Sequence, residues 1–353
     1  MFNTLITGPF GSVLNFIYSL VNNYGLAIII FCIVCKLLLF PLTLKSKKSM
    51  FANARIQPKM QELQKKYKND KDRYSMELQK LYKEEKVSPL AGCLPLLITM
   101  PILFGLYYVV TQPLYFLMKY SEETVRIIAT NIVTILGNHG VNPDTFARIT
   151  AYVENASAKS NTLQIELANY MSQYGDELQA MTPDVAITKF NFNFLGMNLS
   201  KTPSYEFWTP NFLWGLFILV LVSVGTAFLV GWLGQKLNPM QTGNPDDPTA
   251  KSAASTGKMM IYIMPLMTAF IGFSIPAAVS VYWITNNLLT IGLDVLANKI
   301  AGRKEEEIRQ QKLEEEARKK RNKKKAAELE AQDARQRDFD EPEAKEDKEV
   351  SSE

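Results

Sequence analysis

Apolar and charged residues are segregated along the chain into long alternating blocks. Five apolar blocks cover residues 26–44, 89–118, 207–234, 259–275 and 277–298. A helix crosses the hydrocarbon core of a bilayer in about 20 residues, so each block is long enough, or nearly long enough, to span it. The interval between the last two blocks leaves room only for a tight turn. The pattern predicts an all-α, polytopic membrane protein with five transmembrane helices.

Amphipathic patterns lie on both sides of the first apolar block. In residues 1–25, apolar side chains recur at helical spacing, which predicts an interfacial helix lying against the bundle. The residues that form this stripe are Phe10, Leu14, Ile17 and Val21. Residues 45–88 carry two shorter stripes around a turn at Asn69 and Asp70. We expect a cytoplasmic helical hairpin there, although the stripes are also compatible with a purely structural coiled coil.

Lysine and arginine set the expected orientation. Residues 45–88 hold 13 Lys and Arg against 6 Asp and Glu, whereas residues 120–205 hold 5 against 8. Because basic loops stay in the cytoplasm, residues 45–88, the loop 235–258 and the tail 299–353 are expected inside, and the loop 119–206 outside. The N-terminus then lies outside and the C-terminus in the cytoplasm. The sequence assigns no chemistry to the outer loop.

The tail contains a strongly basic segment. Seven of the eight residues 318–325 are Lys or Arg, enough to attract RNA or anionic lipid headgroups. A charge run of this kind is also typical of a helix face that is simply solvated. The basic positions expected to contact a ribosome or lipid are Arg318, Lys319, Lys320, Arg321, Lys323, Lys324 and Lys325.

One cation lies inside the first apolar block. Lys36 is nine residues before Lys45, about 13 Å along a helix, which is farther than a lysine stem can snorkel. A charge near the bilayer centre costs at least about 2.5–3.5 kcal/mol. Lys36 could pair with Asp294 of the last block, could thin the bilayer, or could line a water-filled groove. The groove reading gives it a function, because an unpaired cation attracts acidic segments of a passing chain.

Polar residues in the other apolar blocks support a groove. Thr99 lies in the second block, and Thr285, Asn286 and Asn287 lie in the last. Polar side chains in lipid need hydrogen-bond partners or water. Bonds between helices explain the asparagines as well as groove lining does.

Several classes of site are not expected. Cys32, Cys35 and Cys93 lie in apolar blocks, which argues against a secreted disulfide framework. His139 is the sole histidine, and there is no Walker-type loop. We therefore expect no metal, no cofactor, no nucleotide, no DNA and no enzymatic chemistry. The first basic residue is Lys36, so the cleavable signal pattern is missing and the chain is expected to enter the membrane uncleaved.

Three stretches resemble YidC-type membrane protein insertases of bacteria, in the short form without a large N-terminal periplasmic domain. The stretch Ser88–Val110 (SPLAGCLPLLITMPILFGLYYVV) resembles the second span of that family. Phe40–Thr43 (FPLT), with a basic stretch and Gln57, Pro58 and Lys59 after it, resembles the first core span and the hairpin. Val281–Ile291 (VYWITNNLLTI) resembles the last helix.

The resemblance implies five core helices around a polar groove that is open to the cytoplasm and the lipid. A basic residue, usually arginine, lies five positions before a proline in the family, and here that residue is Lys36 before Pro41. Thr99 stands where the family usually has glutamine. Lysine keeps the charge but loses the bidentate fork of arginine.

The implied activity is insertion and chaperoning of nascent membrane proteins in the plasma membrane, alone or with the Sec translocon and the ribosome. Gln57, Pro58 and Lys59 would make hairpin contacts. Two alternatives remain open from the residues themselves. One is a small-molecule or ion transporter, which would normally show repeated spans. The other is a non-catalytic assembly scaffold, which would not need Lys36.

Overall fold

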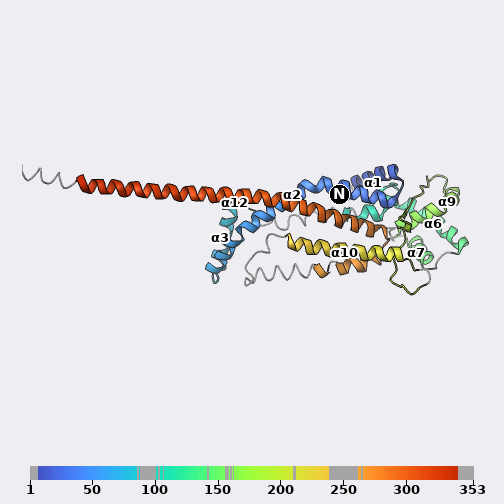
Figure 1. The fold of residues 1–353 in the computed structure, drawn as a ribbon. Helices are drawn as coiled ribbons and strands as arrows, with labels where there is room; N and C mark the ends of the chain where they lie inside the picture. Colours follow the sequence, from blue (N-terminus) through green and yellow to red (C-terminus); the bar gives the residue numbers. More distant parts are fainter. Residues whose placement is uncertain are drawn as a thin grey trace, which may run out of the picture. The chain divides into compact units, whose positions relative to one another are not determined.

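The computed structural model is mostly helical and forms two compact units, Met1–Asn298 and Lys299–Glu353 (Figure 1). It describes residues 7–85, 87, 101, 104–105, 107–140, 143–155, 159, 161, 163–209, 212–237, 261–263 and 265–340. Most of the expected second span, including Thr99 and Cys93, lies outside these residues. Two of the described helices are long and apolar enough to cross a membrane.

Helix α1 (Gly8–Val21) packs on the start of α2 (Tyr24–Lys66). Two residues of the expected stripe, Leu14 and Ile17, are buried, and the other two are partly buried against the same core. The opposite face of α1 is also apolar and exposed. Its residues are Val13, Phe16 and Leu20. A helix that is apolar on both faces fits an environment of protein on one side and lipid on the other.

Helix α2 is continuous through the expected end of the first span at residue 44. Asn23 caps its first turn by accepting a hydrogen bond from the backbone N–H of Leu26 at 3.0 Å. Pro41 and Pro58 both lie inside the helix. The residues after position 44 are mostly good helix formers with no glycine, so the helix leaves the apolar block without a break.

Helix α3 (Lys71–Glu84) follows a short turn and contacts α2. Asp70 caps α3 by accepting from the backbone N–H of Arg73 at 2.9 Å. Ile56 of α2 and Leu81 of α3 are buried, and the Tyr82 hydroxyl lies 3.7 Å from the sulfur of Met60. The apolar stripes read from the sequence therefore lie on the less exposed sides of both helices.

The segment from residue 113 to 206 builds a small helical region. Six apolar side chains of α6 (Glu122–His139) are buried, among them Ile128 and Ile132. They form one core with residues of the following helices. The other elements of this region are α5 (Pro113–Phe116), α7 (Pro143–Glu154), α8 (Gln164–Gln173), α9 (Gly175–Met181), β1 (Asn193–Phe194) and β2 (Met197–Asn198).

The segment 190–201 fastens this region to the long helices. Asn191 accepts a hydrogen bond from the backbone N–H of Tyr24 at 2.9 Å, and the backbone N–H of Ala278 donates to Leu199 at 3.0 Å. Phe190 and Phe192 are buried, and the ring of Phe192 lies 5.1 Å from that of Tyr24. One extended segment thus joins the beginnings of α2 and α12 and holds them close together.

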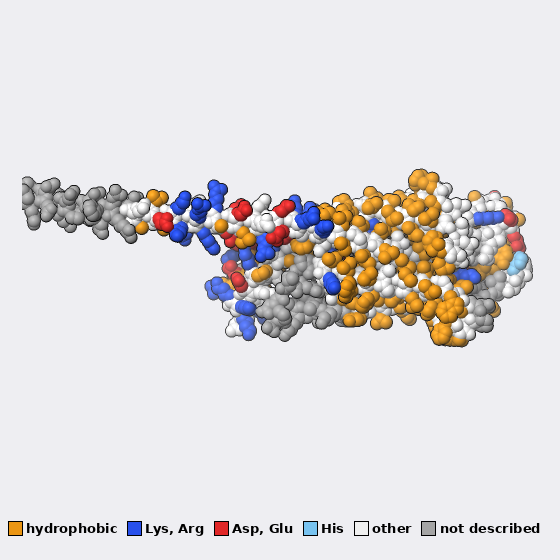
Figure 2. Space-filling model, viewed as in Figure 1, with side chains coloured by type: hydrophobic (Ala, Val, Ile, Leu, Met, Phe, Trp, Pro, Cys, Tyr) orange, Lys and Arg blue, Asp and Glu red, His pale blue; other side chains and the backbone are white. Residues whose placement is uncertain are grey.

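Helix α10 (Trp214–Lys236) is the second helix long enough to span, and only 17% of its apolar window is buried. A shorter apolar helix, Ile261–Gly272, follows, with residue 264 outside the described residues. Helix α12 (Ala278–Asp340) then runs through the expected last span and into the tail without a break. In unit Met1–Asn298, Figure 2 shows a belt of hydrophobic side chains over α2 and α10, with charged side chains beyond both edges. Such a belt is the surface expected of a protein embedded in lipid.

Candidate functional site

Lys36 lies near the middle of the apolar part of α2. It is 12 residues after Tyr24, about 18 Å along the helix axis. Cys32 lies one turn earlier and is buried as a free thiol, as Cys35 is. The next residues, Leu37 and Leu38, are 59% and 75% exposed. The ammonium of Lys36 is therefore on the inner face of the helix while its neighbours point outward.

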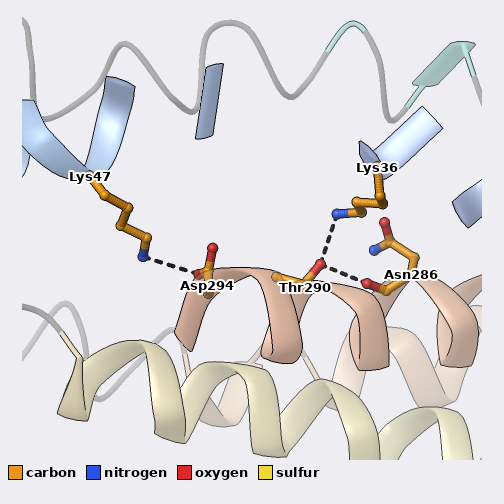
Figure 3. A network of polar contacts seen from close by, with 5 residues as sticks. All are labelled: Lys36, Lys47, Asn286, Thr290 and Asp294. Carbon is orange, nitrogen blue, oxygen red and sulfur yellow. Dashed lines mark hydrogen bonds and ion pairs between the residues drawn. The ribbon is translucent and has the colours of Figure 1, made fainter. Parts of the chain in front are cut away.

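The Lys36 ammonium contacts α12. Its Nζ donates to the hydroxyl of Thr290 at 2.8 Å, and that hydroxyl donates to the backbone carbonyl of Asn286 at 2.6 Å. Figure 3 shows the side-chain amide of Asn286 on the same side of α12, pointing toward Lys36. A cation, a hydroxyl and an amide therefore gather between two helices, in a region whose outer surface is apolar.

The hydrogen-bond capacity of Lys36 is only partly used. An ammonium group has three N–H donors, and Thr290 is its one hydrogen-bond partner among the described residues. Lys36 is also partly exposed. A partly desolvated cation with unused donors is stabilised by water or by an incoming anionic group. The arrangement can therefore bind a carboxylate by charge and hydrogen bonding.

Asp294 forms its ion pair with Lys47 and not with Lys36. Its Oδ2 lies 3.1 Å from Nζ of Lys47, and the two side chains are 25% and 12% exposed. Lys36 and Lys47 are 11 residues apart on α2, whereas their partners Thr290 and Asp294 are one turn apart on α12. The two lysine side chains accordingly lean toward each other, as Figure 3 shows. In place of a Lys36–Asp294 pair, the structure therefore has two separate contacts, Lys36 with Thr290 and Lys47 with Asp294.

The other residues expected in the groove have different partners. The Asn287 amide donates to the hydroxyl of Thr226 on α10 at 3.2 Å, which is a bond between helices. Thr285 donates to the carbonyl of Val281 in its own helix at 2.8 Å. Asn286 and Thr285 are partly exposed. Thr99 lies outside the described residues.

A small pocket borders this region. It has about 170 Å³ of empty space and lies between α10 and α12. Thr290 and Asp294 supply its polar side chains. Its remaining lining residues are Val230, Leu233, Gly234, Leu237 and Ile291.

The residues expected to make hairpin contacts all lie within α2. Gln57 is partly exposed, and Pro58 and Lys59 are exposed. Nζ of Lys59 lies 2.6 Å from a carboxylate oxygen of Glu85, just after α3. Arg55 approaches the other oxygen of Glu85 at 4.0 Å. Of the three, Lys59 therefore connects α2 with the end of α3.

The basic tail segment lies in the unit Lys299–Glu353. All seven of its Lys and Arg side chains are exposed on α12. Lys324 lies 3.9 Å from Glu328 one turn later, a pair that contributes little when exposed. The charge of this segment is available to an outside partner.

Three residues of the site were missed in reading the sequence. Thr290 is the partner of Lys36, and Lys47 is the partner of Asp294. Thr226 is the partner of Asn287. A signal for Thr290 was present, because it lies four residues after Asn286 and four before Asp294, on one face of a helix. Lys47 and Thr226 carried no such signal, since their partners lie on another helix.

The comparisons with known proteins agree with this architecture. The family model described as "60Kd inner membrane protein" matches residues 16–305. The protein named "Membrane protein insertase YidC" from Syntrophus aciditrophicus is 55% identical over 94 residues, which is 27% of this chain and 17% of that protein.

Two further proteins with the same printed name are similar over comparable lengths. The one from Geotalea uraniireducens is 50% identical over 99 residues, 28% of this chain and 19% of the relative. The one from Actinobacillus succinogenes is 50% identical over 103 residues, 29% of this chain and 19% of the relative. Each alignment thus covers less than a fifth of the relative's length. Because the family model matches most of its length, this chain belongs to the 60Kd inner membrane protein family.

Proposed function

We propose that this protein is a membrane protein insertase and chaperone. It binds nascent membrane proteins in a polar intramembrane groove and releases them sideways into the lipid. The observation that carries the proposal is the Lys36 ammonium, which lies near the middle of the apolar part of α2 and has one hydrogen-bond partner among the described residues. The printed names of the relatives support the same activity.

We propose a topology of five transmembrane helices, with the N-terminus outside and the C-terminus in the cytoplasm. The excess of Lys and Arg in residues 45–88 and in the tail supports this orientation. The outer region, 119–206, then faces away from the cytoplasm. The hydrogen bonds of its segment 190–201 to the beginnings of α2 and α12 support a groove that is closed on that side.

The proposed mechanism needs no covalent chemistry. An acidic or polar end of the client enters from the cytoplasm, and Lys36 offsets the cost of taking its charge out of water. Polar backbone groups of the client are accommodated by Asn286, which lies beside Lys36 (Figure 3), together with Thr285 and Asn287; Thr99, which lies outside the described residues, is expected to contribute as well. The apolar part of the client then moves into lipid, which stabilises it by about 25 cal/mol per Å² of buried apolar surface.

We further propose two cytoplasmic partners. The exposed basic segment, residues 318–325, is placed to bind ribosomal RNA or anionic lipid by charge. Cooperation with the Sec translocon follows from the resemblance alone. Both partnerships concern the delivery of clients and leave the role of Lys36 unchanged.

Insertion into proteoliposomes tests the function. The client is a short single-span protein with acidic residues at its translocated end, and insertion is measured by protease protection. We expect Lys36→Ala to slow insertion about tenfold, equivalent to about 1.4 kcal/mol of barrier. Lys36→Arg should keep most of the rate because it keeps the charge. The matched control is Lys45→Ala, which removes an exposed lysine from the same helix.

Charge reversal gives the sharpest outcome. Lys36→Glu should insert acidic-ended clients more slowly than Lys36→Ala, because a like charge in the groove repels them. Equal rates for the wild type and Lys36→Glu would refute a charge-based groove. A client without acidic residues should be affected much less by either variant.

A further inference from the structure

Asp294 is a partly exposed carboxylate in a pocket at the end of the polar region. It lines the space between α10 and α12 together with Thr290 and apolar side chains. Its present counter-ion is Lys47, at 3.1 Å. With a side-chain exposure of 25%, Asp294 is accessible from the pocket while it is paired.

A second acceptor lies next to Asp294 along the helix. The Oδ1 atom of Asn298 is buried and has no hydrogen-bond partner among the residues that the structure describes. Asn298 is four residues after Asp294, so the two side chains lie on the same face of α12. A buried acceptor without a donor is costly. A carboxylate and an unpaired amide oxygen one turn apart match a cation that carries several N–H donors.

We propose that this pocket binds a lysine or arginine side chain at the cytoplasmic end of an inserting segment. This site, the basic-flank site, consists of Asp294 in the pocket and Asn298 one turn later on α12, and Lys47 is paired with Asp294 while no client is present. The proposal rests on the proposed insertase function and specifies which clients it favours. The incoming cation replaces Lys47 on Asp294, and Lys47 is released toward the lipid headgroups.

This exchange has a low electrostatic cost, because one cation replaces another on the same carboxylate. Arginine should be favoured over lysine, since its planar fork can bond to carboxylate and amide oxygens together. The order of charges also fits a client. Its acidic, translocated end meets Lys36 first, and its basic, cytoplasmic end meets Asp294 only after the apolar segment has left the groove, because the two contacts lie one turn apart on α12, much less than the length of a spanning segment. The site therefore helps to set the orientation in which a segment is released.

Two clients that differ only in their cytoplasmic flank test the proposal. One carries two arginines directly after its apolar segment, and the other carries two glutamines there. Insertion is measured in vesicles of phosphatidylglycerol and phosphatidylcholine, so that no lipid primary amine competes for the pocket. Full-length protein with Leu237→p-benzoylphenylalanine reports by photocrosslinking whether the flank reaches the pocket. Thermal unfolding in detergent shows that each variant is folded.

Asp294→Asn should reduce both crosslinking and insertion of the arginine-flanked client about fivefold or more, and should leave the glutamine-flanked client within twofold. Lys47→Gln should keep or increase crosslinking of the arginine flank, because it vacates the carboxylate. Equal losses in both variants and with both clients would overturn the proposal, since a purely structural ion pair predicts that result. The proposed function has a separate test with the glutamine-flanked client. If the wild type inserts this client no faster than Lys36→Ala does, the proposed function is contradicted.

Exchanging the two charges distinguishes a purely structural ion pair from the basic-flank site. The double variant Lys47→Asp with Asp294→Lys restores an ion pair between α2 and α12. A structural pair would be rescued by this exchange for every client. The basic-flank site predicts no rescue for the arginine-flanked client, because position 294 then repels it, and faster insertion of a client with two glutamates at that flank.

Discussion

Lys36 on α2 and Thr290 on α12 are joined by a hydrogen bond of 2.8 Å across 254 residues of sequence. The bond fixes the direction of Lys36, the only cation in the apolar part of α2, residues 24–44, and brings it beside Asn286 (Figure 3). It uses one of the three N–H donors of Lys36, and no other described residue takes the remaining two. The contact therefore both orients Lys36 and keeps it available.

The hydroxyl of Thr290 should matter for stability. Thr290→Val keeps the shape of the side chain but removes the acceptor, so the free energy of unfolding should fall by about 1–2 kcal/mol. Denaturation of the purified protein by SDS in mixed micelles measures this change. Thr290→Ser is the matched control because it retains the hydroxyl. A Thr290→Val variant as stable as Thr290→Ser would show that the bond contributes little.

Gly11 allows α1 to approach α5 closely. A Cβ atom at Gly11 would lie 2.7 Å from the carbonyl oxygen of Phe116 and 2.9 Å from its Cβ. These atoms belong to the backbone or adjoin it, so they have little freedom to move. Gly11→Ala should lower the free energy of unfolding by about 1–3 kcal/mol, measured by thermal unfolding in detergent.

Another helical glycine provides the control for that substitution. A Cβ at Gly137 of α6 would meet only Phe146, at an ordinary 3.8 Å. Gly137→Ala should therefore be neutral or stabilising by up to about 1 kcal/mol, because alanine favours the helix. Similar destabilisation by both substitutions would contradict the close approach at Gly11.

Tyr18 should help to hold the outer region on the long helices. Its hydroxyl accepts a hydrogen bond from the backbone N–H of Asn191 at 2.9 Å. Tyr18→Phe should lower the free energy of unfolding by about 1 kcal/mol and speed proteolysis within residues 190–201. Tyr205→Phe, at a side chain that is 62% exposed, should change neither quantity. Unchanged proteolysis in Tyr18→Phe would mean that the other bonds of the segment suffice.

Substitution of Lys59 tests whether this residue has a role in insertion beyond its ion pair with Glu85. Its ion pair with Glu85 has a distance of 2.6 Å, but Lys59 is 59% exposed, so Lys59→Met should cost at most about 1 kcal/mol of stability. The effect should shrink at high salt. If insertion of clients in proteoliposomes falls much more than this small loss predicts, Lys59 also contacts clients. Insertion that follows stability alone would limit Lys59 to joining α2 and α3.

Alkaline pH should loosen the outer region through Tyr120. Burial raises the pKa of the Tyr120 hydroxyl above the ordinary tyrosine value of about 10, and this hydroxyl donates to the carbonyl of Ala186. The folded state thus favours the neutral form, so its contribution is complete below pH 10 and is lost as the pH rises toward the higher pKa of the folded state. The melting temperature in detergent should fall more steeply above pH 10 in the wild type than in Tyr120→Phe. Identical slopes would exclude Tyr120 as a source of this pH dependence.

Local sequence patterns were sufficient to predict those features that depend on a single helix. The stripe with Leu14 and Ile17 predicted the buried face of α1, and Lys36 was recognised from its place in an apolar block. These properties depend on the period of the helix and on the cost of a charge in lipid. They are therefore readable without knowing any neighbouring element.

The fold of the outer region and the partners in the site could not be read in this way. The core around Ile128 and Ile132 uses residues of several helices. The buried residues of α6 recur at helical spacing, but this period does not show which other helices cover them. The sequence offered Asp294 as a possible partner of Lys36, but the carboxylate is taken by Lys47. Which lysine reaches it depends on how α2 and α12 are aligned, and that alignment is a property of the packing.

The sequence by itself determined that the chain is a helical membrane protein with a cation among apolar residues, because segregation of charge from long apolar blocks is a one-dimensional property. Only the tertiary structure decided that Lys36 bonds to Thr290, that Lys47 neutralises Asp294, and that the segment 190–201 joins the beginnings of α2 and α12. Each of these contacts connects residues more than 75 positions apart. A hydrogen bond or an ion pair acts over about 3 Å, so its partner is set by the packing of helices and not by spacing along the chain.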